Sequence, residues 1–136
     1  SIEFTGWVDT QQLNELYASC DLFVMPSEGD GFGIVFLEAM MRGKPCVGLR
    51  TGSAAEVFEE GKSGILVDRE DRLGMAKSIA ALLNDPERTA KMGHAARQRY
   101  QEYFRARHYH ERLEAILLPH VQHRKSQIRS PLSHAD

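Results

Sequence analysis

Short hydrophobic runs alternate along the chain with segments of helical spacing, and this order predicts a parallel α/β sheet. Residues 22–25 form an apolar run that ends at Pro26, which is typical of a strand buried on both faces of a parallel sheet. Residues 46–49 and 64–67 predict two further strands, and residues 2–5 predict a short strand before them. The segments between the runs have the hydrophobic period of helices.

The first predicted helix follows Asp9. This residue can cap the helix, and Gln12 lies three positions later in the register of a capping box. Leu13, Leu16 and Tyr17 then continue with helical spacing. We therefore expect one helix between the first two strands, with these three side chains on one face.

The run at residues 34–41 is compatible with helix or strand when judged by its hydrophobic period alone. Its glycine-rich entry, Gly43 as a stop signal and Pro45 just beyond it favour a helix. Residues 53–56 have the pattern of a second capping box, which would open a short helix that reaches Phe58.

The last third of the chain is predicted to be helical. Residues 70–83 carry a broad apolar stripe, and Asp85 with Pro86 suits the N-cap and first turn of the next helix. The inner face of that helix is expected to contain Met92, Ala96, Tyr100, Tyr103 and Phe104. A final helix over residues 106–117 should stop at Pro119.

This order of elements predicts a parallel Rossmann-like α/β sheet followed by C-terminal helices. A chain of 136 residues fits one domain, which we place at residues 1–118. Residues 119–136 are polar and poorly patterned, so we expect them to form a disordered tail.

The charge and hydrophobicity of the chain exclude some classes of protein. The net charge is −2 and the positive charges are scattered until the last third, so no nucleic-acid partner is expected. No apolar run is long enough for a transmembrane segment, and we expect no signal peptide at Ser1. Cys20 and Cys46 each lie beside a hydrophobic run, which suggests free thiols in a cytoplasmic protein, with a disulfide as the alternative.

The candidate chemistry begins at the turn formed by residues 30–33, which leads directly into the helix at residues 34–41. Ligands of parallel α/β sheets lie outside the carboxyl ends of the strands, and this turn follows such an end. Gly31 and Gly33 let a ligand approach the main chain, and the free N–H groups at the start of the helix favour a diphosphate. A plain loop is the alternative for the turn taken alone.

Glu38 is the one carboxylate in an otherwise apolar helix. An isolated buried charge is costly, so Glu38 needs a partner or must face a cleft. Arg42, one turn later, could pair with it, but an exposed pair contributes only about 0.3–0.5 kcal/mol. In the functional interpretation, Glu38 accepts hydrogen bonds from two sugar hydroxyls. Asp30 could cap the helix or contact the other end of the same ligand.

The stretch PSEGDGFGIVFLEAM, at residues 26–40, resembles the signature of retaining GT-B glycosyltransferases of family four, also called group 1. Two acids separated by seven residues, with Gly-Phe-Gly after the first, form the pattern, and Gly-Lys-Pro follows at residues 43–45. The lead-in at residues 6–27 and the loop and strand at residues 52–67 are also similar to the family. The likeness runs from about residue 2 to residue 104.

The resemblance implies roles for these residues. Glu38 would hold the ribose of a nucleoside diphosphate sugar, and Asp30, where the family usually has Glu, would be the catalytic residue beside the transferred sugar. The main-chain amides that would bind the diphosphate or the sugar hydroxyls belong to Gly31, Phe32, Gly33 and Ile34. The donor would be a UDP-, GDP- or ADP-sugar, with no metal and no other cofactor, because dipoles and basic side chains offset the leaving-group charge.

The implied reaction is hexose transfer with retention, in polysaccharide biosynthesis, by a longer enzyme that could associate peripherally with a membrane. We expect the chain to lack the first strands of the donor-binding domain and the N-terminal acceptor-binding domain. The family's phosphate-binding Arg and Lys lie on those strands, and Arg42, Lys44 and Arg50 do not occupy their positions. The isolated chain is therefore expected to be inactive. The alternative is a non-catalytic module that associates through an exposed sheet edge.

Overall fold

The computed structural model describes residues 2–29, 31–105, 107–108, 111 and 115. The chain divides into two compact units, Ser1–Glu102 and Tyr103–Asp136. The fold that follows belongs to the first unit. The predicted final helix at residues 106–117 falls almost entirely outside the described residues, and the predicted tail at residues 119–136 lies wholly outside them.

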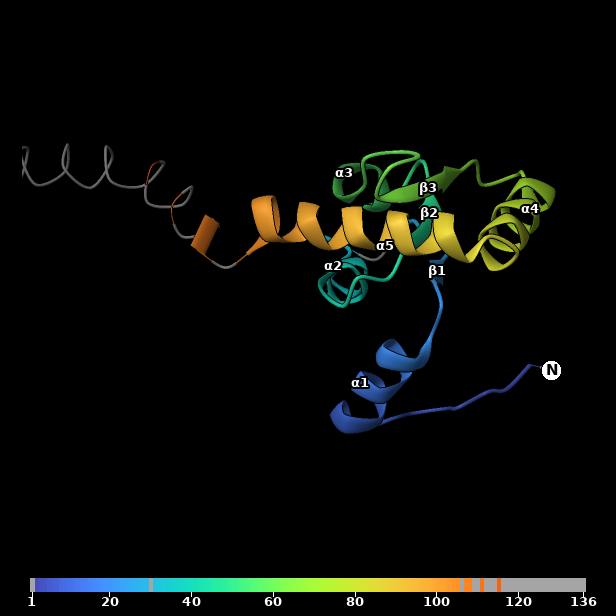
Figure 1. The fold of residues 1–136 in the computed structure, drawn as a ribbon, viewed down its shortest axis with the longest axis horizontal. Helices are drawn as coiled ribbons and strands as arrows, with labels where there is room; N and C mark the ends of the chain where they lie inside the picture. Colours follow the sequence, from blue (N-terminus) through green and yellow to red (C-terminus); the bar gives the residue numbers. More distant parts are fainter. Residues whose placement is uncertain (1, 30, 106, 109–110, 112–114, 116–136) are drawn as a thin grey trace, which may run out of the picture. The chain divides into compact units, whose positions relative to one another are not determined.

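Three parallel strands form the sheet of the first unit (Figure 1). They are β1 (Phe23–Met25), β2 (Cys46–Leu49) and β3 (Gly64–Val67), and they lie in the order β1-β2-β3. Residue Val47 at the centre of β2 pairs with Val24 on one side and with Ile65 on the other. All four residues of β2 are buried, whereas β1 is only half-buried. The predicted parallel α/β fold is confirmed, although β1 is an edge strand and is not buried on both faces.

The predicted strand at residues 2–5 is wrong. These residues have no regular secondary structure, and the side chains of Ile2 and Phe4 are 86% and 93% exposed. A strand requires hydrogen-bonding partners for its main chain. Among the described residues, β1 pairs only with β2, so no neighbouring strand is present for residues 2–5 to join.

Two helices cover one face of the sheet, α2 (Ile34–Met41) and α3 (Ala54–Val57). The helix predicted for residues 34–41 is therefore confirmed, and Gly43, with a φ of 70°, follows it in the left-handed region. Aromatic rings link the elements on this face, because Phe36 lies 5.7 Å from the ring of Phe23 and 4.9 Å from that of Phe58. This cluster holds the start of α2 against the sheet.

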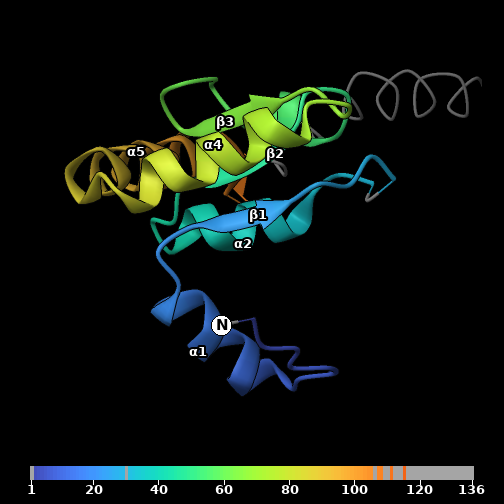
Figure 2. The same ribbon diagram turned by 90° about the vertical axis from the view of Figure 1, so that its right-hand side faces the viewer.

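The opposite face packs against α4 (Arg72–Leu83), and Figure 2 shows α2 and α4 on the two sides of the sheet. Helix α5 (Pro86–Arg99) contacts both α2 and α4 and buries Met92 and Ala96, as predicted. Its main chain approaches the loop before β2 so closely that a side chain at Gly93 would clash with the carbonyl oxygen of Gly43. The π-helix η1 (Tyr100–Phe104) follows α5. Tyr100 packs against the core, as predicted, whereas Tyr103, the first residue of the second unit, is exposed.

Most of the predicted helix caps are present. The capping box of α1 (Thr10–Ser19) is complete, because the Gln12 amide donates to Asp9 over 2.8 Å and the Asp9 amide donates to the Gln12 side chain over 3.1 Å. Asp85 caps α5, with Pro86 in its first turn. The box predicted for residues 53–56 is wrong: Ser53 already has helical backbone angles, and its side chain makes no capping hydrogen bond.

Helix α1 differs from expectation in how it packs. Of the three side chains predicted for one face, only Tyr17 is buried, while Leu13 and Leu16 are exposed. Cys20 and Cys46 are free thiols, and burial raises the pKa of Cys46, as expected for a buried hydrophobic residue. No helix in the described part of the chain is long and apolar enough to cross a membrane.

Candidate functional site

The predicted turn lies at the carboxyl end of β1 and leads into α2. Gly31 and Gly33 have φ values of 64° and 70°, which are left-handed conformations that favour glycine. Phe32 and Ile34 on either side of Gly33 are 58% and 62% exposed. The first N–H groups of a helix have no partner within it, and Gly33 at the N-cap has no side chain to satisfy them. The local geometry therefore suits the binding of an anion at this helix end.

Gly33 is required for a second reason besides its backbone angle. A Cβ atom at this position would lie 2.5 Å from the Ser53 Oγ and 3.0 Å from the ring of Phe36. The loop before α3 therefore packs directly against the turn that opens α2. Ser53, which the sequence predicts as a helix cap in the loop that resembles the family, therefore lies beside the candidate site.

Asp30, the predicted catalytic residue, lies outside the described residues. Its role and its distance from Glu38 therefore remain predictions. The residues predicted to bind the donor through their main-chain amides are all described, and they are contiguous at the start of α2: Gly31, Phe32, Gly33 and Ile34.

Glu38 has a hydrogen-bond partner in Tyr17, a pairing that the sequence did not predict. The Tyr17 hydroxyl, from α1, donates to the Glu38 Oε2 over 3.0 Å and lies 3.3 Å from the carbonyl oxygen of Val35. Burial, followed by this hydrogen bond, raises the pKa of Tyr17 well above its usual value. The tyrosine is therefore a protonated donor throughout the physiological pH range.

Arg42, the partner considered for Glu38 in the sequence, contacts its main chain. Arg42 Nη1 donates to the carbonyl oxygen of Glu38 over 2.9 Å, and Nη2 donates to the side chain of Asn14. The guanidinium also lies over the ring of Tyr17, 5.0 Å from its centroid. A carboxylate–guanidinium ion pair therefore does not account for Glu38.

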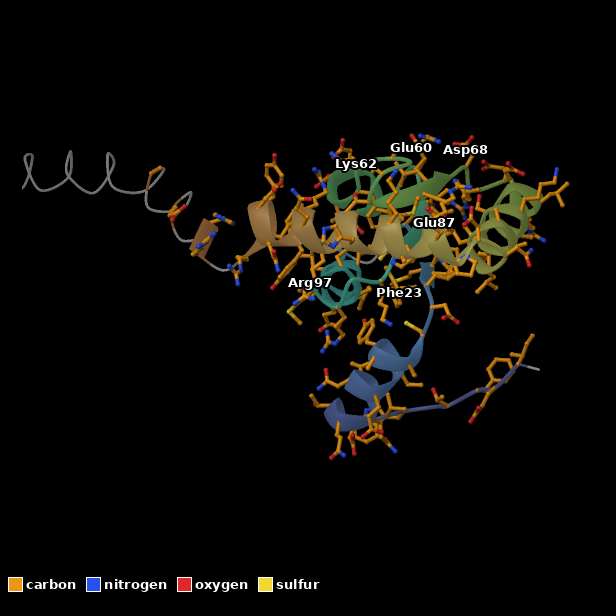
Figure 3. The ribbon with its side chains drawn as sticks, in the orientation of Figure 1. Phe23, Glu60, Lys62, Asp68, Glu87 and Arg97 are labelled. Atoms are coloured by element: carbon orange, nitrogen blue, oxygen red, sulfur yellow. The ribbon has the colours of Figure 1, made fainter. Side chains whose placement is uncertain are left out.

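Lys44 and Arg50, which do not occupy the phosphate-binding positions of the family, also have partners within the protein. Lys44 Nζ donates to the carbonyl oxygens of Ala18 and Cys20, over 2.9 Å and 2.7 Å, at the end of α1. Arg50 forms ion pairs at the surface beside β3, where Figure 3 shows its partners Glu60 and Asp68. These contacts agree with leaving both cations out of the donor site.

A surface cavity of about 510 Å³ adjoins the carboxyl ends of the strands. Its lining includes Pro26, Glu28, Leu49 and Asp68, which follow or end the three strands. Glu28 pairs with Arg69 over 2.5 Å and accepts a hydrogen bond from Thr51. Neither Glu38 nor the turn at residues 31–33 lines this cavity, so it neighbours the candidate site without containing it.

Tyr17 could have been found from two complementary needs. A tyrosine on the buried face of a helix must place its hydroxyl beside an acceptor. Glu38, alone in an apolar helix, needs a donor. The sequence shows both needs, but 20 residues separate the two positions, and only the contact between α1 and α2 joins them.

Among the described residues, no group of three or more His, Cys, Asp or Glu side chains could hold a metal ion.

Comparison with known proteins agrees with this geometry. Residues 1–99 match the family model of glycosyl transferases, group 1. The chain is 40% identical over 102 residues to the N-acetyl-alpha-D-glucosaminyl L-malate synthase of Bacillus anthracis. This alignment covers 75% of the chain and 27% of that protein. It is 39% identical over 103 residues to a sulfoquinovosyl transferase of Arabidopsis thaliana, covering 74% of the chain and 20% of that protein. The chain thus spans about a quarter of the length of these relatives.

Two solved structures resemble the fold. The HepE protein of Anabaena in complex with UDP and glucose aligns with a TM-score of 0.71 at 29% identity, over 77% of this chain and 29% of that one. The C-terminal domain of a group 1 glycosyl transferase from Francisella tularensis aligns with a TM-score of 0.69 at 22% identity, over 76% of this chain and 53% of that one. The second likeness shows the fold alone.

Proposed function

Because the chain belongs to the group 1 glycosyl transferases, we propose that its α2 end is the donor site of a hexosyltransferase that acts with retention. The chain is a nucleotide-sugar glycosyltransferase domain of this family. The observation that carries the proposal is the arrangement on α2. A glycine-led helix start without a side-chain cap lies at the carboxyl end of β1, and Glu38 lies along the same helix.

The two ends of this arrangement suit the two parts of a nucleoside diphosphate sugar. Main-chain N–H groups at Gly33 and Ile34, with the positive end of the helix dipole, would bind the diphosphate. The Glu38 carboxylate would accept hydrogen bonds from the ribose hydroxyls. UDP and UDP-glucose are bound in the related HepE structures, which supports a uridine donor as the first to test.

In the complete reaction, the protein would act mainly by positioning the donor and stabilising the departing diphosphate. Asp30 would lie beside the transferred hexose. We propose that a longer protein carries out this reaction, since the chain spans only 27% and 20% of the two relatives compared above. No step of this scheme requires a metal ion.

We expect the 136-residue chain by itself to bind donors weakly and to have no transferase activity. Arg42 and Lys44 are engaged with α1, and Arg50 with acids on either side of β3, so these three cations would not contact the diphosphate, and we propose that main-chain N–H groups bind it. A main-chain N–H group carries no net charge, so a diphosphate site without Arg or Lys donors lacks the attraction of an ion pair and loses affinity.

The test is a titration of the isotope-labelled chain with UDP-glucose, GDP-mannose and ADP-glucose, followed by NMR. We expect the amide signals of residues 31–34 to shift with at least one donor. Glu38→Ala should weaken that binding about tenfold, because it removes hydrogen bonds to a charged acceptor. Glu56→Ala, at an exposed acid on α3, is the matched control and should leave binding unchanged. Tight binding that Glu38→Ala does not alter would show that the site is assigned wrongly.

A further inference from the structure

We propose that Tyr17 is a positioning residue of the donor site, which fixes the Glu38 carboxylate through Oε2 and leaves Oε1 to bind the ribose. This inference rests on the proposed function, because it concerns how the same carboxylate is held for its ligand. It extends the site to α1, an element outside the family signature on residues 26–45.

The contact that supports the inference is direct. The Tyr17 hydroxyl lies 3.0 Å from the Glu38 Oε2, and the tyrosine side chain is only 5% exposed. Among the described residues, only the Tyr17 hydroxyl donates a hydrogen bond to this carboxylate, and its acceptor is Oε2. One oxygen is therefore held by the protein, and Oε1 has no hydrogen-bond partner in the part of the chain that the structure describes.

The ring of Tyr17 is held from more than one direction. The ring of Phe23, which Figure 3 shows at β1, lies 5.7 Å from it. The guanidinium of Arg42 lies 5.0 Å from the Tyr17 centroid and is itself bonded to Asn14 on α1. Lys44 holds the last carbonyls of α1. The hydroxyl thus has a fixed place over α2.

A fixed donor matters because a glutamate side chain on a helix has several rotamers of similar energy. A hydrogen bond from a rigid neighbour selects one of them before the ligand arrives. The ordering cost is then met on folding rather than on binding, so affinity for the ligand increases. The raised pKa of Tyr17 keeps the hydroxyl protonated and able to donate.

The experiment compares two probes, UDP and 2′,3′-dideoxy-UDP, on the full 136-residue chain, with the same pair of guanosine nucleotides in parallel. The second probe of each pair lacks the hydroxyls that Glu38 would bind. The ratio of the two dissociation constants therefore measures how much the ribose hydroxyls contribute to binding. The variants are Tyr17→Phe, Glu38→Ala and, as a matched control, Tyr100→Phe. Tyr100 is partly buried against the same core, whereas Tyr17 is buried, and the Tyr100 hydroxyl has no hydrogen bond to any described residue.

We expect the wild-type chain to prefer the ribose form, and Glu38→Ala to abolish that preference. Tyr17→Phe should reduce it about fivefold, as the loss of one hydrogen bond does, while Tyr100→Phe leaves it unchanged. A purely structural role would lower the stability of the Tyr17 variant but would not change the ratio. A ratio that Tyr17→Phe leaves intact while Glu38→Ala abolishes it would overturn the inference alone. Equal binding of both probes by the wild type would overturn the donor site, and the inference with it.

Discussion

At the scale of single residues, the site depends on two side chains from different helices and on one glycine. Tyr17 supplies the donor that Glu38 needs, and the bond between them explains how a carboxylate is accommodated among apolar residues of α2. Gly33 supplies both a left-handed backbone and the space that Ser53 and Phe36 occupy. The role of each of these residues depends on side chains that are distant in the sequence and close in the fold.

The glycine gives a prediction at this scale. Gly33→Ala should lower the free energy of unfolding by about 2–4 kcal/mol, because it adds backbone strain and a clash with Ser53. Gly31→Ala is the matched control, since Gly31 has a similar φ but open space around it, and should cost only about 1 kcal/mol. Urea unfolding measures both, and Ser53→Gly should recover part of the Gly33→Ala loss. Equal costs at the two glycines would contradict the proposed contact.

At the scale of elements, α1 is attached to the rest of the unit mainly by polar contacts. Leu13 and Leu16 are exposed, whereas Lys44 and Arg42 bond to groups on α1. Helix α5 is attached differently, through close approach of main chain to main chain at Gly93 and Gly43. Capping signals placed both helices correctly, but they did not indicate how either one packs.

A substitution at Gly93 separates helix propensity from packing. Alanine favours a helix interior by about 1 kcal/mol over glycine, so propensity alone predicts that Gly93→Ala stabilises the protein. The clash with the carbonyl of Gly43 should outweigh this gain and lower the free energy of unfolding by about 1–3 kcal/mol. His94→Ala, at the next and exposed position, should be neutral or slightly stabilising in the same denaturation experiment. An increase in stability for Gly93→Ala would mean that α5 is not packed this closely.

At the scale of the whole molecule, the sheet has one fully buried strand, and β1 is half-buried at an edge. The face of the sheet under α2 and α3 contains the aromatic cluster and Tyr17. Tyr17 therefore belongs both to the main core and to the proposed donor site. A change in the charge of a buried group in this core should therefore change the free energy of unfolding of the whole unit.

The raised pKa values of Tyr17 and Cys46 predict that stability falls at alkaline pH. Burial is the main cause for both groups, so each holds its proton more tightly in the folded chain than in the unfolded chain. Above their ordinary values of 9.0 for cysteine and 10.0 for tyrosine, unfolding releases protons, and the free energy of unfolding declines as pH rises. Below those values the contribution is complete.

Urea denaturation between about pH 8 and pH 11 measures this decline. Tyr17→Phe removes one of the groups with a raised pKa, so its stability should fall less steeply above the ordinary tyrosine pKa than that of the wild type. Tyr100→Phe leaves Tyr17 and Cys46 in place, so it is again the control and should keep the alkaline decline that these two groups cause. Parallel curves for all three proteins would show that Tyr17 ionises as easily in the folded chain as in the unfolded one.

The sequence by itself determined the local elements and the family signature. Strands at residues 46–49 and 64–67, the helix at residues 34–41 and the caps at Asp9 and Asp85 depend on short-range chemistry, which a pattern records. The position of the turn after β1 follows from the same signals.

Only the tertiary structure decided which side chains meet. The pairing of Tyr17 with Glu38, the attachment of Arg42 to Asn14 and the contact of Ser53 with Gly33 join residues far apart in the chain. The failure of residues 2–5 to form a strand has the same origin, since a strand depends on a neighbour and not on its own residues. Hydrophobic period is set within one element, whereas hydrogen-bond partners and free space are set by how the elements pack.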